Sequence, residues 1–176
     1  MEEIDLQNYI RSVPDFPKKG INFKDITTLL KDPIPLKATL RLLFEFTKNK
    51  SITKVVGIES RGFIFGSMLA EKLDVGFVPV RKPGKLPAET VRESYSLEYG
   101  EDAIEIHKDA IKPGDKVLIH DDLLATGGTA KATANLIKKL KGEVAQLSFI
   151  IELSFLKGRE QLKDYDVRAL IDYKSE

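Results

Sequence analysis

The stretch VLIHDDLLATGGTAKA, from Val117 to Ala132, joins an apolar strand, two adjacent carboxylates, a Thr-Gly-Gly-Thr turn and the start of a helix. Backbone N–H groups in a glycine-rich turn can converge on an anion, because glycine adopts the required dihedral angles and has no side chain to block approach. The helix that begins near Thr129 adds its positive dipole end. Asp121 and Asp122 would repel a phosphate, so we expect them to hold ribose hydroxyls, or a divalent cation through water. The stretch therefore predicts a site for a phosphorylated sugar.

The same turn excludes two other classes of phosphate-binding protein. A Walker A loop needs Gly-x-x-x-x-Gly-Lys-[Ser/Thr], and a dinucleotide-binding loop needs Gly-x-Gly-x-x-Gly. The Thr-Gly-Gly-Thr turn matches neither pattern. We therefore do not expect an ATPase or a dinucleotide-dependent enzyme.

Composition limits the remaining choices. With 176 residues, 42% of them hydrophobic and 31% charged, the chain is expected to form one domain with a proper core. A net charge of +1 gives no reason to expect nucleic acid as a partner. The absence of cysteine excludes disulfides and thiolate chemistry, and two histidines argue against a histidine-built zinc site. No secretory signal or membrane-spanning run is evident, so we expect a cytoplasmic protein that does not bind membranes.

Hydrophobic periodicity predicts alternating helices and strands. Helices are expected over Glu2–Ser12, Leu36–Lys48, Phe63–Leu73 and Ala130–Lys141. Strands are expected over Lys54–Ile58, Val75–Val80, Val117–His120 and Val144–Leu153. Ser94–Leu97 and Ala103–His107 are expected to form a small antiparallel pair around Gly100. Short apolar strands separated by helices predict an α/β fold with a mostly parallel, twisted sheet flanked by helices on both faces.

The segment around Asp121 closely resembles the PRPP-binding motif of the type I phosphoribosyltransferases, and its LLATGGT core resembles the adenine-specific branch of that family. Other stretches agree, in order along nearly the whole chain: PDFP (14–17), GINFKDI (20–26), ESRGF (59–63), RKPGKLP (81–87), SYSLEYG (94–100) and LKGRE (156–160). The resemblance implies a type I phosphoribosyltransferase fold in a single domain, residues 1–176, with an N-terminal hood (1–35) and a flexible flap (about 82–107).

The resemblance also implies an activity. The 5-phosphoribosyl group of PRPP would be transferred to adenine, giving AMP and pyrophosphate in purine salvage. Mg2+ would be required, held mainly by PRPP and water, with no direct metal ligand expected from the protein. Family members are commonly homodimers, so a homodimer is expected.

Site residues follow from matching this sequence to the family motifs. The residues that would be catalytic are Glu98, Asp121, Asp122 and Arg61. Those that would hold the 5′-phosphate are Ala125, Thr126, Gly127, Gly128 and Thr129. Those that would bind pyrophosphate are Ser60, Arg61, Lys82 and Lys85. Those that would contact adenine are Asn22, Phe23, Lys24 and Leu156.

The residue types suit these assignments. Arg61 offers a planar fork for pyrophosphate oxygens, although the residues alone favour a plain surface ion pair between Glu59 and Arg61. Basic flap residues would stabilise departing pyrophosphate, and Glu98 would manage the proton that the base loses, with Tyr99 steering it. Phe23 can stack on a purine.

Three positions depart from the common family pattern, and two other functions stay open. Asn22 and Lys24 replace a small apolar residue and an arginine, and His120 stands where a branched apolar residue is usual, which favours a core histidine. An oxopurine such as xanthine could replace adenine, since only the hood chooses the base. A non-catalytic PRPP-sensing regulator would need a DNA-binding extension or a strongly basic face, and the sequence has neither.

Overall fold

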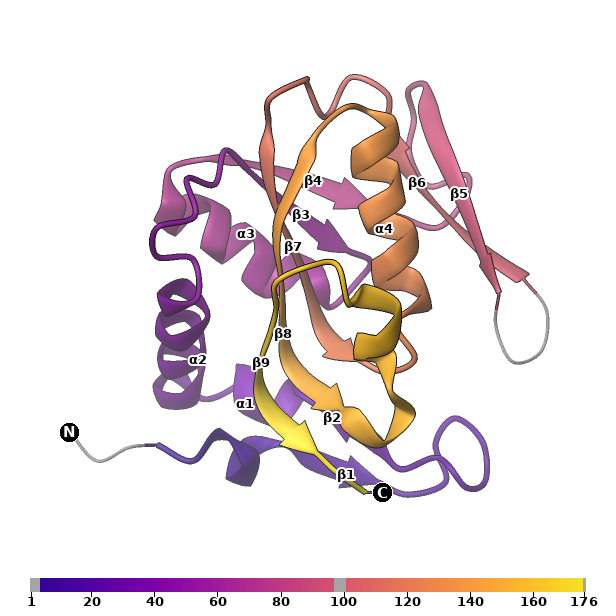
Figure 1. Ribbon diagram of the computed structural model, residues 1–176. Helices are drawn as coiled ribbons and strands as arrows, with labels where there is room; N and C mark the ends of the chain where they lie inside the picture. Colours follow the sequence, from indigo (N-terminus) through magenta and orange to yellow (C-terminus); the bar gives the residue numbers. More distant parts are fainter. Residues whose placement is uncertain (1–3, 97–100, 176) are drawn as a thin grey trace.

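The computed structural model describes residues 4–96 and 101–175, which fold around one parallel sheet (Figure 1). Its strands lie in the order β4-β3-β7-β8-β9, and every pairing between neighbours is parallel. The strands are β3 (Lys54–Ile58), β4 (Gly76–Val80), β7 (Lys116–Leu124), β8 (Glu143–Leu153) and β9 (Val167–Tyr173). The expected α/β fold with a mostly parallel sheet is confirmed.

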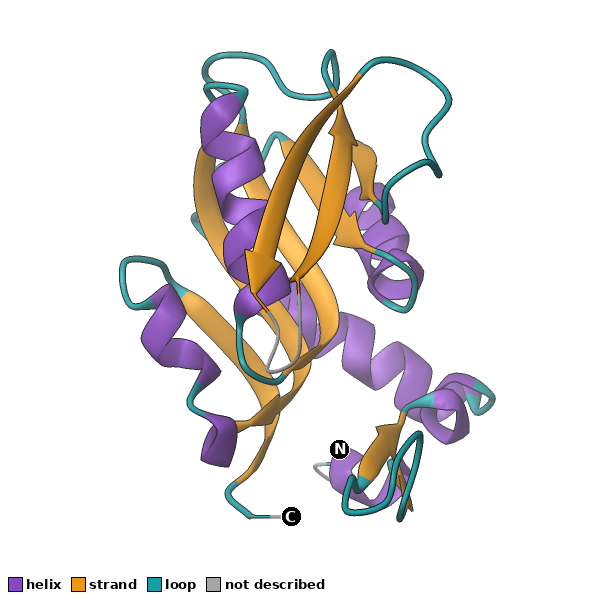
Figure 2. Cartoon of the chain, turned by 90° about the vertical axis from the view of Figure 1, so that its right-hand side faces the viewer, coloured by secondary structure: helices purple, strands orange, loops and turns teal. Residues whose placement is uncertain are grey.

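Helices cover both faces of this sheet (Figures 1 and 2). On one face α2 (Pro33–Glu45) and α3 (Gly62–Leu73) bury one apolar cluster, and on the other face α4 (Gly128–Lys139) buries a second. Val55 belongs to the first cluster and Val56 to the second, because successive strand residues point to opposite faces. The unbroken apolar run of β3 thus serves both cores.

The antiparallel pair within the flap is longer than expected. It consists of β5 (Thr90–Ser96) and β6 (Glu101–His107), paired throughout from Thr90 with His107 to Ser96 with Glu101. The expected end of the first strand, Leu97, and the turn residue Gly100 lie outside the described residues. The pair flanks α4 rather than joining the central sheet (Figure 2).

The N-terminal hood contradicts the helix expected over Glu2–Ser12. Its described residues instead form a 3-10 helix, η1 (Leu6–Tyr9), and a short strand, β1 (Arg11–Val13). Pro14 disfavours helical geometry at the preceding residue, so the chain is extended there. β1 pairs antiparallel with β2 (Phe23–Asp25), and α1 (Thr27–Leu30) follows.

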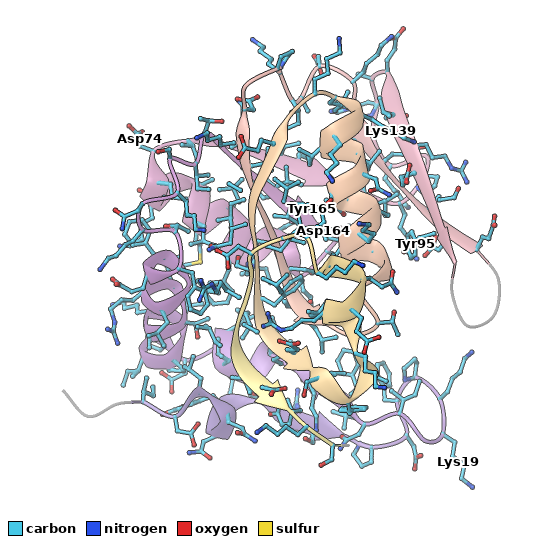
Figure 3. The ribbon with its side chains drawn as sticks, in the orientation of Figure 1. Lys19, Asp74, Tyr95, Lys139, Asp164 and Tyr165 are labelled. Carbon is cyan, nitrogen blue, oxygen red and sulfur yellow. The ribbon has the colours of Figure 1, made fainter. Side chains whose placement is uncertain are left out.

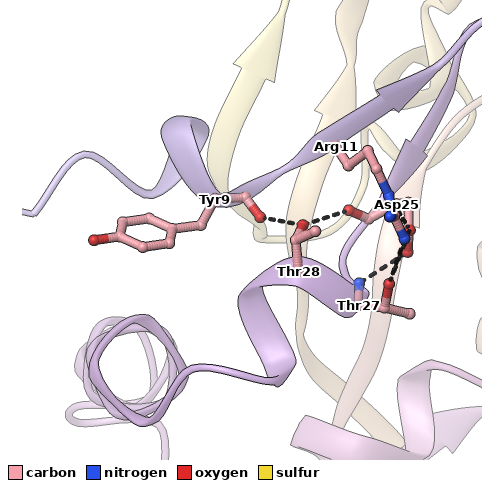
Figure 4. A network of polar contacts seen from close by, with 5 residues as sticks. All are labelled: Tyr9, Arg11, Asp25, Thr27 and Thr28. Carbon is pink, nitrogen blue, oxygen red and sulfur yellow. Dashed lines mark hydrogen bonds and ion pairs between the residues drawn. The ribbon is translucent and has the colours of Figure 1, made fainter.

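Polar contacts tie these hood elements together (Figure 4). Arg11 reaches across the strand pair to Asp25, with Nε 3.0 Å from Oδ2. Asp25 Oδ1 accepts from the backbone N–H of Thr27 at 2.8 Å, and Thr28 Oγ1 donates to the carbonyl of Tyr9 at 2.6 Å. The hood is therefore a hydrogen-bonded unit beyond the arrowheads of β7 and β8 in Figure 1.

Several boundaries differ from the expected ones. The helix expected at Leu36 begins at Pro33, because Asp32 caps it by accepting from Ile34 N and proline is favoured in the first turn. β7 continues past His120 to Leu124, since β8 supplies pairing partners along this length. β9, η2 (Ser154–Leu156) and η3 (Gly158–Leu162) were not predicted from the sequence.

None of the helices in the described ranges combines the length and the apolar character needed to cross a lipid bilayer.

Candidate functional site

The two adjacent carboxylates occupy different environments near the carboxyl end of β7. Adjacent strand residues point to opposite faces, so each meets its own set of neighbours. Asp122 is 3% exposed and accepts a charge-assisted hydrogen bond from Nε of Arg61, the N-cap residue of α3. Asp121 lines a cavity of about 150 Å³ that Lys82 and Tyr95 of the flap also line. Asp122 therefore pairs with Arg61, whereas Asp121 lines a cavity shared with the flap.

Electrostatics separates these groups further. Burial raises the pKa of Asp121 well above its usual value, and the nearby charge of Asp122 raises it more. Burial lowers the pKa of Arg61, but the charge and hydrogen bond of Asp122 outweigh this effect, and its pKa is raised overall. Arg61 is therefore a permanent cation, while a hydroxyl donor or a cation beside Asp121 would relieve an unfavourable buried charge.

Gly62 allows α3 to begin directly against the acids. A Cβ atom at Gly62 would lie 2.7 Å from the carbonyl oxygen of His120 and 3.0 Å from Oδ1 of Asp121. The close approach brings Arg61 within reach of β7, and its guanidinium carbon lies 5.2 Å from the centre of the Phe23 ring. One arginine therefore connects the acids to the hood.

The residues expected to hold a 5′-phosphate form the loop between β7 and α4. Gly127 has φ of +86°, in the left-handed region that favours glycine, and α4 starts at the next residue. Within the described structure no side chain caps this helix, so its first N–H groups remain available to an anion. A cavity of about 210 Å³ is lined by all five expected residues, Ala125, Thr126, Gly127, Gly128 and Thr129.

The loop after β3 is joined to the base of the flap through Glu59. Oε1 of Glu59 accepts from Nη2 of Arg81 at 2.8 Å, and Oε2 accepts from the backbone N–H of Lys82 at 2.8 Å. The bond from Arg81 lowers the pKa of Glu59. The ion pair between Glu59 and Arg61 that the residues alone favoured is wrong, because Arg61 pairs with Asp122 instead. Ser60, joined to Glu59 by a cis peptide bond, is exposed.

The two flap lysines expected to bind pyrophosphate differ in their contacts. Nζ of Lys82 donates to Oδ2 of Asp102 at 3.0 Å, and this bond lowers the pKa of Asp102. The same oxygen accepts from the hydroxyl of Tyr95 at 3.2 Å, where the strand pair faces α4 (Figure 3). Lys85 is exposed, and its carbonyl accepts from Arg81. Lys82 is thus held by an acid that an anion would have to replace.

The hood places its expected base-contacting residues on different faces. Phe23 lies edge-on to Phe16, with ring centres 5.3 Å apart. The side chain of Lys24 points to the other face of β2, where it is 5% exposed, donates to Ser12 Oγ at 3.0 Å and lies over the ring of Tyr173. Oδ1 of Asn22 is buried without a hydrogen-bond partner among the described residues. A contact between Lys24 and a base would therefore use its backbone.

Leu156 and His120 differ in their exposure to solvent. Leu156, in η2, is 38% exposed, which leaves it free to cover an apolar ligand. His120 is fully buried, with Nδ1 3.0 Å from Ser148 Oγ, and burial lowers its pKa to about 3. The expected core histidine is confirmed. Glu98 and Tyr99 lie outside the described residues.

The residues that hydrogen-bond to the charged side chains of the site were not predicted from the sequence. Asp102 accepts from both Lys82 and Tyr95, and Glu152 accepts from Arg159. The SYSLEYG and LKGRE stretches contain Tyr95 and Arg159, but their acidic partners lie outside those stretches. Only these motif matches could have drawn attention to them.

The described residues contain no ready-made metal site, and a second cavity lies away from the phosphate loop. Among residues 4–96 and 101–175, no group of three or more His, Asp or Glu side chains could together hold a metal ion. A larger cavity of about 890 Å³ lies between η1, α2 and β9. It lies away from the phosphate loop, whereas ligands of open α/β sheets gather at the carboxyl ends of the strands, where that loop lies.

Comparisons with known proteins agree with this geometry. A family model described as a phosphoribosyl transferase domain matches residues 26–174. The adenine phosphoribosyltransferase of Christiangramia forsetii is 58% identical over 170 residues, which cover 97% of this chain and 99% of that protein.

Two solved structures have the same fold. The adenine phosphoribosyltransferase of Thermoanaerobacter pseudethanolicus superposes with a TM-score of 0.94 at 51% identity, covering 96% of this chain and 98% of that one. The Saccharomyces cerevisiae enzyme, solved with D-2,5-dideoxy-2,5-imino-altritol 1,6-bisphosphate and adenine, has a TM-score of 0.87 at 43% identity, covering 94% and 96%.

Proposed function

This chain belongs to the phosphoribosyltransferase family, and from that membership we propose that it transfers the 5-phosphoribosyl group of PRPP to adenine, giving AMP and pyrophosphate in purine salvage. The resemblance read from the sequence is confirmed. One structural observation carries the proposal: an uncapped glycine turn at the start of α4 follows β7, the strand that carries Asp121 and Asp122. That sequence of groups matches a sugar with hydroxyls on one side and a phosphate on the other.

The phosphate loop and the acids would fix the ribose. In our proposal the residues from Ala125 to Thr129 bind the 5′-phosphate through backbone N–H groups and the dipole of α4. Asp121 and Asp122 orient the ribose. The raised pKa of Asp121 supports this role, because a carboxylate in that position gains most from a cationic ring carbon or a hydroxyl donor.

The pyrophosphate would leave toward the loop after β3 and the flap. Ser60, Arg61, Lys82 and Lys85 would contact it, with the guanidinium of Arg61 as a planar donor. Lys82 would exchange Asp102 for pyrophosphate, and closure of the flap would keep water from the reacting carbon.

The base would lie between the hood and η2. Phe23 would stack on it, the backbone near Asn22 and Lys24 would read its edge, and Leu156 would cover it. Glu98 would take the proton that adenine loses, a role that rests on the family resemblance. Relatives named adenine phosphoribosyltransferase, at 58% and 61% identity, support adenine over an oxopurine.

We further propose that Mg2+ takes part, since it would neutralise the pyrophosphate charge of PRPP. The ion would be held mainly by PRPP oxygens and water, because Mg2+ usually keeps several waters and binds substrate phosphates. A homodimer of single-domain chains, in the cytoplasm where a multiply charged substrate such as PRPP is retained, completes the proposal.

The deciding experiment measures pyrophosphate release from PRPP with Mg2+ while adenine, hypoxanthine, guanine and xanthine are offered separately. AMP formed with adenine alone is the expected result, and removal of Mg2+ with EDTA should abolish it. Turnover with an oxopurine would contradict the choice of base. Binding of PRPP without turnover of any base would contradict the enzymatic function and favour a sensor.

A further inference from the structure

The loop that would bind the 5′-phosphate rests against a second backbone segment, residues 154–162, which we call the support segment. A Cβ atom at Gly127 would lie 2.5 Å from the carbonyl oxygen of Gly158. A Cβ atom at Gly158 would overlap the carbonyl oxygen of Ala125. The two backbones are therefore in direct contact, and any shift of the support segment moves the phosphate loop.

Side chains reinforce this contact. Nε2 of Gln161 donates to the carbonyl of Thr126 at 2.8 Å, so the support segment is also hydrogen-bonded to the loop. Leu162, at the end of η3, is 1% exposed and belongs to the core that α4 covers. In Figure 1 the short helix η3 lies beside the first turns of α4.

An ion pair between Arg159, whose side chain is 48% exposed, and the buried Glu152 fixes the support segment to the sheet. Nε of Arg159 lies 2.8 Å and 2.9 Å from the two carboxylate oxygens of Glu152, and Nη2 lies 2.7 Å from Oε2. Nη1 donates to the carbonyl of Val167 at 2.8 Å, so Arg159 joins the end of β8 to the start of β9. Glu152 is 5% exposed, and loss of its partner would leave a buried charge unpaired.

Leu156, the residue expected to cover the base, lies near the start of the support segment and is 38% exposed. Only Lys157, with φ of +56°, separates it from Gly158. The same short segment therefore sets the position of an apolar side chain for the base and of the loop for the phosphate.

We propose that Arg159 and Glu152 act as a clamp that positions both the phosphate loop and Leu156. They are positioning residues, because neither touches the reacting atoms. The proposal rests on the function proposed above, and it names the groups that keep the phosphate and base subsites at a fixed separation. A shift on the scale of 1 Å in a bound reactant can cost about 100-fold in rate, so this separation matters.

The test compares Arg159→Met and Glu152→Gln with the wild type and with Arg168→Met. Arg168 is a matched control, since it pairs with Asp166 at the surface near the same strand and is 54% exposed. Thermal melts first establish that each variant is folded at the assay temperature. Calorimetry with ribose 5-phosphate then measures the phosphate subsite, and initial rates give KM for PRPP and adenine and kcat.

We expect the Kd of ribose 5-phosphate and the KM of PRPP to rise about 10-fold in both clamp variants. KM for adenine should also rise and kcat should fall by up to about 100-fold, because misplaced reactants react more slowly, while Arg168→Met matches the wild type. Methylguanidinium added to folded Arg159→Ala should restore part of the affinity, which a purely structural defect would not allow. Values within twofold of the wild type in folded clamp variants would overturn the proposal.

Two provisions keep the test decisive. If Arg159→Met does not fold, Arg159→Lys takes its place, because an ammonium keeps the charge but cannot span both Glu152 oxygens and the Val167 carbonyl. If the wild type does not convert adenine, the proposed function fails, whereas the ribose 5-phosphate titration still decides whether the clamp exists.

Discussion

Replacing Gly127 with alanine would place a methyl group 2.5 Å from the carbonyl oxygen of Gly158, in a backbone conformation with φ of +86°. Left-handed geometry costs a residue with a side chain about 1–2 kcal/mol. Overpacking against a fixed neighbour adds about 1–3 kcal/mol. The neighbour here is backbone, so the loop itself must move to relieve the contact.

Gly114 separates these two costs. Its φ is +92°, close to that of Gly127, but a Cβ atom there would meet nothing within 4 Å. Gly114→Ala therefore introduces the backbone strain without the clash. The excess of about 1–3 kcal/mol in Gly127→Ala, if it is expressed as lost binding, corresponds to a rise of about 5- to 150-fold in KM for PRPP.

The assay is the initial rate of pyrophosphate release with adenine in excess and PRPP varied, at a temperature where thermal melts show all variants folded. We expect Gly114→Ala to lose stability but keep the wild-type KM. We expect Gly127→Ala to raise the KM of PRPP at least fivefold above that of Gly114→Ala. Equal KM values for the two variants would refute the reasoning that the loop is held against Gly158.

Three other predictions follow from the same geometry. Because the pKa of Asp121 is raised, the stability of the wild type should fall as the pH rises above 3.8 through the folded-state pKa. Asp121→Asn should remove this pH dependence from thermal melts and lower kcat about 100-fold. An unchanged pH dependence of the melting temperature in this variant would contradict the prediction. Asp102→Asn should free Lys82 and strengthen product inhibition by pyrophosphate by up to about fivefold, the range of an exposed ion pair, whereas weaker inhibition would count against competition for this lysine. Phe23→Ala should raise the KM of adenine about 5- to 150-fold through lost stacking. Lys24→Met, on the other face of β2, should leave this KM within twofold of the wild type. A larger effect of Lys24→Met than of Phe23→Ala would contradict stacking of the base on Phe23.

Much of the fold could be predicted because its signals are local. The apolar runs of β3 and β8 and the periodicity of α3 and α4 gave elements within a few residues of the observed ones. The helix predicted over Glu2–Ser12 is not formed, because Pro14 disfavours helical geometry before it and β1 pairs with β2. β9 was missed, although its pairing with β8 completes the sheet.

In the candidate site, too, the features set by neighbouring residues could be predicted, and the pairings between distant residues could not. The phosphate loop and its acids are contiguous in sequence, and glycine dihedral preferences act within a few residues. The partners of the charged groups are not contiguous: Glu59 pairs with Arg81, and Arg61 with Asp122. Nothing in an isolated Glu-x-Arg pattern distinguishes these pairings from a local one.

The sequence by itself determined the chemistry of this protein: a glycine turn that can bind phosphate, two carboxylates beside it, and a basic flap. Only the tertiary structure decided how those groups differ from one another. Asp121 and Asp122 acquired separate surroundings from the alternation of β7 and the packing of α3 and the flap. Burial and long-range pairing set charge states and positions, and both depend on neighbours that are distant along the chain.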